Sequence, residues 1–298
     1  MTACEPSKTV IAIFGPTASG KTAVAEAVAS RIPAEIVSAD SMQVYRGLPL
    51  LTNQPSGATA LVGVWPLDHE GSVGDYQRLA HEAIDAALAA GRTPILVGGT
   101  GLYLRAALAD LGLPPVPPPG ARERWERLYD RLGAQAAHSA LAERDPAAAA
   151  AVHANDRRRV VRALELHGTG ATLAPPRSRL WSGETRRPTR IFGLEVPQDV
   201  LAARIHARTV AMFAGGVEEE VARVREETLS RSATQIIGLR EIRELPREEA
   251  VAAIELRTRR YVAYQRKWMR RIPALTLVPA DRSADETAAD ILAALDEP

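Results

Sequence analysis

The stretch VIAIFGPTASGKT, Val10–Thr22, decides the fold of this chain. Its first five residues, Val10–Phe14, form an unbroken apolar run, which predicts a strand buried in a parallel sheet. The other eight match the pattern G-x-x-x-x-G-K-[ST] of a phosphate-binding loop (P-loop), and the helix-forming segment Thr22–Arg31 follows. Because strand, loop and helix occur in the order that the motif requires, a chance glycine-rich turn is disfavoured.

The P-loop residues have separate expected tasks. Glycines let the backbone N–H groups surround a phosphate, and the helix N-terminus adds partial positive charge. Lys21 is expected to reach the terminal phosphate oxygens, and the Thr22 hydroxyl to bind Mg²⁺. The motif fits a kinase, a hydrolase acting on ATP and a transferase whose leaving group is pyrophosphate. The predicted diphosphate or nucleotide loop comprises Gly15, Pro16, Thr17, Ala18, Ser19, Gly20, Lys21 and Thr22.

Strand and helix signals alternate after the loop. Glu35–Ser38 and Pro94–Val97 are predicted strands, and apolar spacing predicts a helix over Asp75–Ala90 between them. Strand signals return at Arg190–Val196 and at Leu275–Val278. This order predicts an α/β fold: a P-loop NTPase-like core with a mostly parallel sheet and helices on both faces.

A proline-rich break at Leu113–Gly120 interrupts the alternation, since neither a helix nor a central strand can continue through it. Ala121 to about Gly168 is predicted to be helical, and Ala174–Thr189 to be a loop rich in Pro, Ser and Arg. We therefore predict a helical insertion domain within one core. Residues 1–112 are its first part, 113–189 the insertion, and 190–298 its second part with basic C-terminal helices.

Composition narrows the class of protein. The hydrophobic fraction is 46% and the charged fraction 24%, as in ordinary globular proteins. No apolar run approaches the roughly 20 residues of a membrane span, and the polar leader Met1–Lys8 leaves no room for a signal peptide. The single cysteine, Cys4, excludes disulfides and a cysteine metal site, and the six histidines show no metal-ligand spacing. We expect a cytoplasmic protein without a membrane partner.

Three further segments carry candidate chemistry. Val37–Gly47 (VSADSMQVYRG) places Asp40 at the end of a strand, where open α/β sheets bind ligands, although Asp also caps helices. Leu96–Leu104 (LVGGTGLYL) brings backbone and the Thr100 hydroxyl towards a ligand, or forms a plain tight turn. Asn155–Glu165 (NDRRRVVRALE) has four arginines in six residues, which indicates either a polyanion site or a solvated basic face.

Together these segments resemble the tRNA dimethylallyltransferase (isopentenyl-tRNA transferase) family. The likeness spans about residues 10–270, and its combination of segments is far more specific than the P-loop alone. The chain departs from the family pattern at Gln54, in Val64–Asp68 (VWPLD) and in Val262–Gln265 (VAYQ), which bears on RNA contacts and packing more than on the reaction. The resembling segments are GPTASGKT, VSADSMQVYRG, LVGGTGLYL, NDRRRVVRALE, Arg204–Val221, Gln235–Glu241 and Thr258–Arg270.

The resemblance implies transfer of a dimethylallyl group from dimethylallyl diphosphate to N6 of the adenosine 3′-adjacent to the anticodon in tRNA, releasing diphosphate. Asp40 would be the general base for the exocyclic amine. Lys21, Mg²⁺ at Thr22 and Arg208 would stabilise the leaving group. Thr100, also assigned a catalytic role, would hydrogen-bond the adenosine or its sugar-phosphate. The implied partners are the tRNA anticodon stem-loop and dimethylallyl diphosphate, and a monomer is expected.

Recognition of tRNA is expected to combine an extruded base with phosphate contacts and stacking, with the helical insertion as a tRNA-binding part. Tyr261, Tyr264 and Trp268 interleave with the basic cluster Arg257–Arg271 and form either a stacking surface or part of the core. The expected tRNA-binding residues are Asp40, Ser41, Met42, Gln43, Thr100, Arg122, Arg158, Arg159, Arg162 and Arg240.

Three alternative functions remain. A small-molecule kinase or ATP hydrolase leaves the insertion and the basic helix unexplained. An adenylate dimethylallyltransferase, acting on free adenine nucleotide, keeps the chemistry but has less need of a basic insertion. A non-catalytic RNA-binding protein with a vestigial loop is disfavoured because Lys21, Thr22 and Asp40 are intact.

Overall fold

The computed structural model describes residues 9–114, 117–174, 179–225 and 229–296. In this part of the chain a five-stranded sheet has the order β2-β3-β1-β4-β5, and every neighbouring pair is parallel. The predicted α/β class is confirmed, and each predicted strand lies within one residue of its expected bounds. The strands are β1 (Val10–Phe14), β2 (Ala34–Ser38), β3 (Thr93–Gly98), β4 (Thr189–Glu195) and β5 (Leu275–Pro279).

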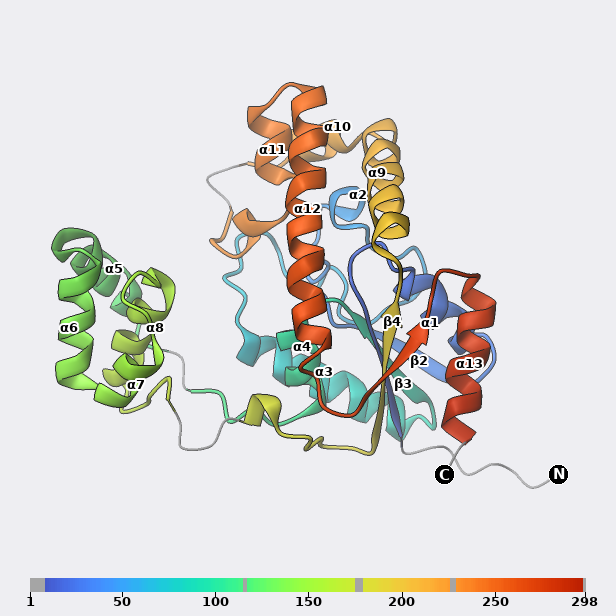
Figure 1. The fold of residues 1–298 in the computed structure, drawn as a ribbon, viewed down its shortest axis with the longest axis horizontal. Helices are drawn as coiled ribbons and strands as arrows, with labels where there is room; N and C mark the ends of the chain where they lie inside the picture. The colour runs from blue at the N-terminus through green and yellow to red at the C-terminus, as the bar shows by residue number, and fades with distance from the viewer. Residues whose placement is uncertain (1–8, 115–116, 175–178, 226–228, 297–298) are drawn as a thin grey trace. The chain divides into compact units, whose positions relative to one another are not determined.

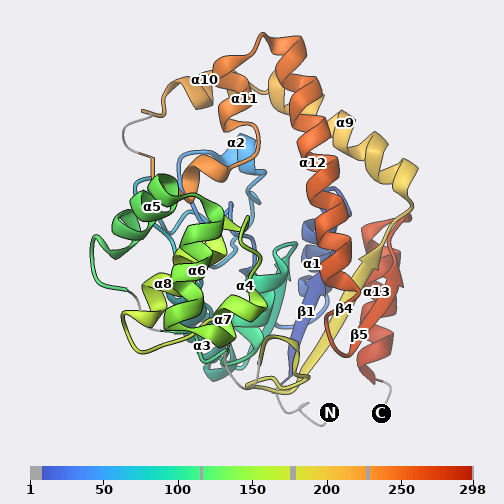
Figure 2. The same cartoon turned by 60° about the vertical axis from the view of Figure 1, so that its left-hand side comes forward.

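Helices cover both faces of the sheet, as Figures 1 and 2 show. On one face α1 (Lys21–Ala29) packs against α13 (Ala284–Asp296) and contacts β1, β2 and β3. On the other face α3 (Val73–Ala89) packs against α4 (Gly101–Leu108). This double covering explains why the strands are continuous apolar runs rather than alternating ones.

The main core lies between the sheet and α1. Side chains alternate along a strand, and Ile11 and Ile13 of β1 join Val28 of α1 and Phe192 of β4 in one buried cluster. Each such side chain contributes roughly 1.5–3 kcal/mol when it is fully buried. The apolar strands thus fix the sheet, whose edge carries the loops of the candidate site.

The rest of the core is helical and follows β4. Helix α12 lies beside α9 and also contacts α4 (Figure 1). Within the described ranges no helix combines the length and apolar character that a membrane span requires. The helices between β4 and β5 are α9 (Gln198–Ala214), α10 (Val217–Ala222), α11 (Leu239–Glu244) and α12 (Arg247–Met269), with a 3₁₀ turn at Ala233–Gln235. The short helix α2 (Pro49–Thr52) and a 3₁₀ turn at Arg179–Trp181 precede β4.

The chain divides into two compact units, one of residues 1–110 with 180–298 and one of residues 111–179. The second unit contains four helices among its described residues, with Tyr129, Leu141 and Val160 in its core. The segment from Ala121 to about Gly168, predicted to be helical, is divided into separate helices, because Gly133 has φ +81° and the Asp145 side chain caps a new helix. Its helices are α5 (Ala121–Leu132), α6 (Ala134–Arg144), α7 (Pro146–Ala151) and α8 (Arg157–His167).

The C-terminal limit of the second unit differs from the predicted 189, because residues 180–189 pack with the core. Arg105 of α4 is buried and donates to the carbonyl oxygens of Leu180 and Ser182, at 2.9 and 2.8 Å. This bonding fixes the segment that leads into β4. The predicted leader with Cys4, residues 115 and 116 of the proline break and residues 175–178 of the predicted loop lie outside the described residues.

Candidate active site

Three loops meet at the carboxyl edge of the sheet. The P-loop follows β1, Asp40 follows β2 and Thr100 follows β3, and these strands are neighbours in the order β2-β3-β1. Parallel strands end at one edge, so the order alone brings the three loops together. The predicted catalytic residues Asp40 and Thr100 therefore lie in the loops after β2 and β3, and Lys21 lies where the P-loop after β1 enters α1.

The P-loop is tightly closed. Ala18 and Gly20 have φ of +67° and +85°, a left-handed conformation that is unusual for the alanine. A Cβ atom on Gly15 would lie 2.7 Å from Ser19 Oγ, so the loop leaves no room for a side chain there. The Ser19 hydroxyl is buried and has no hydrogen-bond partner among the described residues. The backbone is thus shaped around a small polar space.

Lys21 lies over this loop, and its Nζ donates to the carbonyl oxygen of Pro16 at 2.8 Å. Burial lowers the pKa of Lys21 from 10.5 to about 8; nearby Asp40 opposes this change, whereas nearby Arg208 adds to it. Burial also lowers the pKa of Arg208, again against the charge of Asp40. The structure therefore brings two cations and one carboxylate into a common electrostatic environment, in which anionic oxygens would be stabilised.

Asp40 is held in a defined turn. Its Oδ1 accepts the backbone N–H of Met42 at 2.9 Å and, more weakly, that of Gln43 at 3.4 Å. Gln43 links this turn to the end of α2, since its Nε2 donates to the carbonyl oxygen of Asn53 at 2.8 Å. The carboxylate is therefore oriented by its own loop, as in other Asx turns.

Thr100 links the loop after β2 to helix α12 through its hydroxyl. Thr100 Oγ1 accepts the backbone N–H of Ser41 at 3.2 Å and lies 3.2 Å from the Ser41 hydroxyl. It also lies 3.2 Å from the hydroxyl of Tyr261 on α12. Burial and then the charge of Asp40 raise the pKa of Tyr261, so its hydroxyl stays protonated. Sequence reasoning treated Tyr261 only as a stacking or core residue.

Gln265 was not predicted as a site residue, although it lies in the resembling segment Thr258–Arg270. Its side chain is only 1% exposed. Oε1 accepts the backbone N–H of Thr17 in the P-loop at 2.8 Å, and Nε2 donates to the carbonyl oxygen of Gly99 at 3.0 Å. A Cβ atom on Gly99 would overlap this amide. One side chain thus bridges the P-loop and the loop that carries Thr100.

Replacing Gln265 by methionine keeps the side-chain length but leaves the Thr17 N–H and the Gly99 carbonyl without this partner. We expect the free energy of unfolding to fall by about 1–3 kcal/mol, the cost of unsatisfied buried polar groups. Urea unfolding measures this change. Gln235→Met, at an exposed glutamine, is the matched control. Equal urea midpoints of unfolding for the two variants would show that the Gln265 amide does not stabilise the fold.

The predicted RNA-binding arginines differ in their ion pairing and in their exposure. In the second unit Arg122 pairs with Glu126 at 3.2 Å, and Arg162 pairs with the buried Glu165 at 3.0 Å. These ion pairs neutralise part of the local charge. Arg240 of α11 also pairs, with Glu244 at 2.8 Å. The predicted arginines with exposed side chains are Arg158, Arg159 and Arg240.

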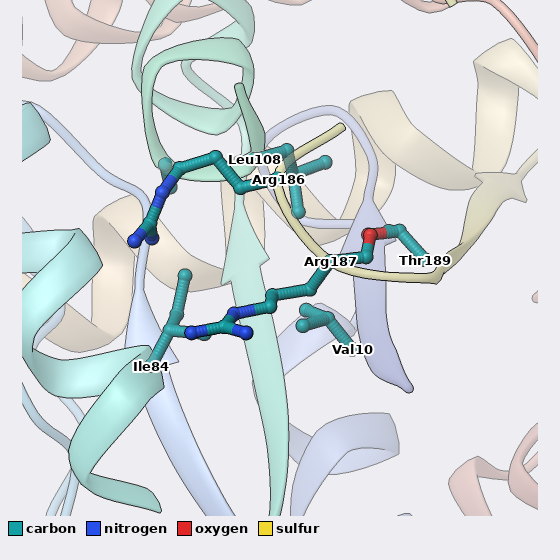
Figure 3. Close-up of a pocket in the computed structure, with 7 residues that line it drawn as sticks. Val10, Ile84, Leu108, Arg186, Arg187 and Thr189 are labelled. Carbon is teal, nitrogen blue, oxygen red and sulfur yellow. The ribbon is translucent and has the colours of Figure 1, made fainter. Parts of the chain in front are cut away.

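A small hollow lies at the opposite end of the sheet (Figure 3). Its lining includes Val10 and Thr189, the first residues of β1 and β4. Arg186 and Arg187, also in the lining, pair with Asp85 at 2.9 and 2.8 Å. The hollow is thus separated from the P-loop by the length of β1, and its charges are compensated.

The fold and the site define an α/β protein with a P-loop at the edge of a parallel sheet, where a carboxylate and two cations meet. The family model described as IPP transferase matches residues 43–272, and the model described as isopentenyl transferase matches residues 8–60. The chain belongs to the IPP transferase family, as its sequence predicted, and it is a prenyltransferase.

Individual relatives agree with this assignment. The chain is 40% identical over 292 residues to a tRNA dimethylallyltransferase from Roseiflexus sp. (strain RS-1), covering 92% of this chain and 94% of the relative. It is 31% identical to a tRNA isopentenylpyrophosphate transferase of known structure from Bacillus halodurans, with a TM-score of 0.67 over 97% of this chain and 96% of that one. A eukaryotic dimethylallyltransferase acting on tRNA, 23% identical with a TM-score of 0.80, shares the fold over 97% of this chain and 80% of its own.

Proposed function

We propose that this chain transfers a dimethylallyl group from dimethylallyl diphosphate to N6 of the adenosine 3′-adjacent to the anticodon in tRNA, releasing diphosphate. The observation that carries the proposal is the position of Asp40 and the P-loop at the same edge of the sheet, with Lys21 Nζ bonded to the loop. The charge of Asp40 acts on the pKa of both Lys21 and Arg208. A base for the acceptor and cations for the leaving group are the two requirements of this reaction. The name of the Roseiflexus relative, tRNA dimethylallyltransferase, supports the same substrates.

In the proposed reaction the N6 lone pair attacks the terminal methylene carbon of the donor. The carbon–oxygen bond breaks, its electron pair goes to the diphosphate, and the N6 proton goes to Asp40. The N–H groups of Met42 and Gln43 bind Oδ1, so we assign proton acceptance to Oδ2. A positioned base of this kind accelerates such a step by about 10²–10⁴-fold.

The leaving group is expected to lie in the P-loop. Backbone N–H groups of the loop, the N-terminus of α1, the Lys21 ammonium and the Arg208 guanidinium would meet the negative charge that grows on the diphosphate. Gln265 acts indirectly, since it holds the Thr17 amide in place. The chain's own residues thus supply donors on more than one side of the loop.

The residues of the loop fit a divalent cation that prefers oxygen ligands. The buried Ser19 hydroxyl has no partner among the described residues, and Thr22 lies half-buried in the first turn of α1. Hydroxyl and diphosphate oxygens are ligands that Mg²⁺ favours. We assign Thr22 as its protein ligand, and when bound Mg²⁺ would supply positive charge to the diphosphate.

The acceptor side is assigned to the loops after β2 and β3. Ser41, Met42, Gln43 and Thr100 would contact the extruded adenosine or its sugar-phosphate. The second unit, with exposed Arg158 and Arg159, together with Arg122, Arg162 and Arg240, would contact tRNA phosphates outside the site. We expect the chain to act as a monomer.

The test incubates the purified chain with Mg²⁺, dimethylallyl diphosphate and either unmodified tRNA or AMP. We expect prenylated tRNA and no prenylated AMP, detected by mass spectrometry of the nucleosides. Prenylation of AMP alone would favour adenylate dimethylallyltransferase activity and reject the proposal. Phosphate release from ATP without RNA would instead favour a kinase or hydrolase.

A further inference from the structure

A row of aromatic side chains, Tyr261, Tyr264, Trp268 and Trp181, runs along α12 and the turn before β4. Neighbouring ring centroids are separated by 6.3 Å from Tyr261 to Tyr264, 6.4 Å from Tyr264 to Trp268 and 4.8 Å from Trp268 to Trp181. Tyr264 is 54% exposed, so it is not a core residue. We call this set the aromatic row.

The aromatic row begins at the candidate active site. The Tyr261 hydroxyl lies 3.2 Å from Thr100 Oγ1. Trp268 packs closely against the start of α4, because a Cβ atom on Gly101 would overlap its ring. Tyr264 stands between these two residues on the same helix. A polymer whose reacting group approaches Thr100 therefore passes close to Tyr264.

Exposed cations lie on the same helix face as the Tyr264 ring. Helical spacing places Arg260, Tyr264 and Lys267 on one face of α12, and Arg271 follows the end of this helix; all four are exposed. The Arg271 guanidinium lies 3.9 Å from the centroid of the Trp181 ring. Exposed aromatic rings among cations are the combination with which proteins bind unpaired nucleotides, because bases stack and phosphates pair with the charges.

We propose that Tyr264 stacks against an unpaired base of the RNA substrate, next in sequence to the adenosine that enters the active site. This inference rests on the proposed function and adds a subsite to it. Trp268 packs beside the Tyr264 ring and is itself packed against Trp181, and Arg260 and Lys267 bind the adjoining phosphates. The occupant is a single-stranded segment of RNA, since bases inside a duplex are stacked on both faces and leave none for a protein ring.

The test measures binding of an anticodon stem-loop RNA to the full chain, separately from catalysis. Tyr264→Ala should weaken RNA binding by about tenfold, within the range found for loss of one base–aromatic stack. Tyr264→Phe should bind as the unchanged chain does. Leu256→Ala is the matched control, because Leu256 is a similarly exposed apolar residue, 50% exposed, on the same helix.

An RNA with an abasic nucleotide beside the target adenosine makes the test specific. If the base stacks on Tyr264, the abasic RNA binds the unchanged chain about tenfold more weakly, and Tyr264→Ala causes no further loss. Equal RNA affinity for the Tyr264→Ala and Leu256→Ala variants would overturn the inference. A Tyr264→Ala variant that changes its oligomeric state but keeps its RNA affinity would overturn it too. Prenylation of tRNA by the unchanged chain is scored independently, so the proposed function can stand when the subsite fails.

Discussion

Replacing Asp40 by asparagine lowers kcat by a factor of about 10²–10⁴, the usual contribution of a positioned general base, while the affinity for tRNA stays close to that of the unchanged chain. Asparagine keeps a side-chain oxygen that can accept the N–H groups of Met42 and Gln43, so the turn is preserved. What it removes is the carboxylate that takes the proton from N6. Single-turnover rates at saturating tRNA and donor measure the change.

Asp145→Asn is the matched control, because the Asp145 carboxylate also accepts a backbone N–H, from Ala148 at 2.9 Å, but caps a helix of the second unit. We expect its turnover to equal that of the unchanged chain. Asp40→Ala should lose turnover in the same way, with tRNA affinity again largely intact. Normal turnover in the Asp40→Asn variant would remove Asp40 from the role of base.

The second large effect is expected at Lys21. Lys21→Met should lower kcat/KM for dimethylallyl diphosphate by about 10²–10³-fold, as loss of one donor to a developing anion does. For the unchanged chain, diphosphate affinity should fall as the pH rises above about 8, because Lys21 then loses its proton in the free protein. Calorimetric titration across this range measures the affinity, and Lys21→Met should lack the break. If the Lys21→Met variant showed an equal fall in diphosphate affinity above pH 8, the fall would come from the titration of another group.

The same pKa also predicts stability. The pKa of Lys21 is about 8 in the folded chain, whereas a lysine in the unfolded chain keeps its ordinary pKa of 10.5. Between these values the unfolded chain holds more protons, so the free energy of unfolding rises with pH there, and below pH 8 the buried charge is destabilising. Without diphosphate, Lys21→Met should therefore be more stable at pH 7, by up to roughly 3 kcal/mol, the equivalent of this pKa difference. Urea unfolding at pH 7 and above 10.5 should show that the advantage disappears at high pH.

The parts of the site that the sequence could predict are local. Val10–Phe14 and the other strands are apolar runs, and parallel strands place the residues that follow them at one edge, which brings Lys21, Asp40 and Thr100 together. Arg208 was an expectation from resemblance, and the structure places it close enough to affect the pKa of Lys21. The roles of these residues stay proposals until the variants are measured.

The parts that the sequence could not predict depend on distant contacts. Gln265 binds the P-loop across 248 positions of the chain, and Tyr261 approaches Thr100 across 161. No local pattern encodes such pairs. The end of the second unit was likewise set by buried Arg105, whose partners lie more than seventy positions later. The pairs of Arg122 with Glu126 and of Arg162 with Glu165 each lie within one helix. Only the approach of Arg122 to Glu165, at 4.0 Å, depends on the packing of α5 against α8.

The amide bridge from Gln265 to Thr17 has a consequence for synthesis of the protein. The P-loop leaves the ribosome well before the side chain that orders it, because 248 positions separate Thr17 from Gln265. Long-range contacts of this kind form late in folding, after loop closure has been achieved. A nascent chain that lacks α12 therefore carries an incompletely ordered phosphate loop, and the capacity to capture the donor arises only after α12 has been synthesised.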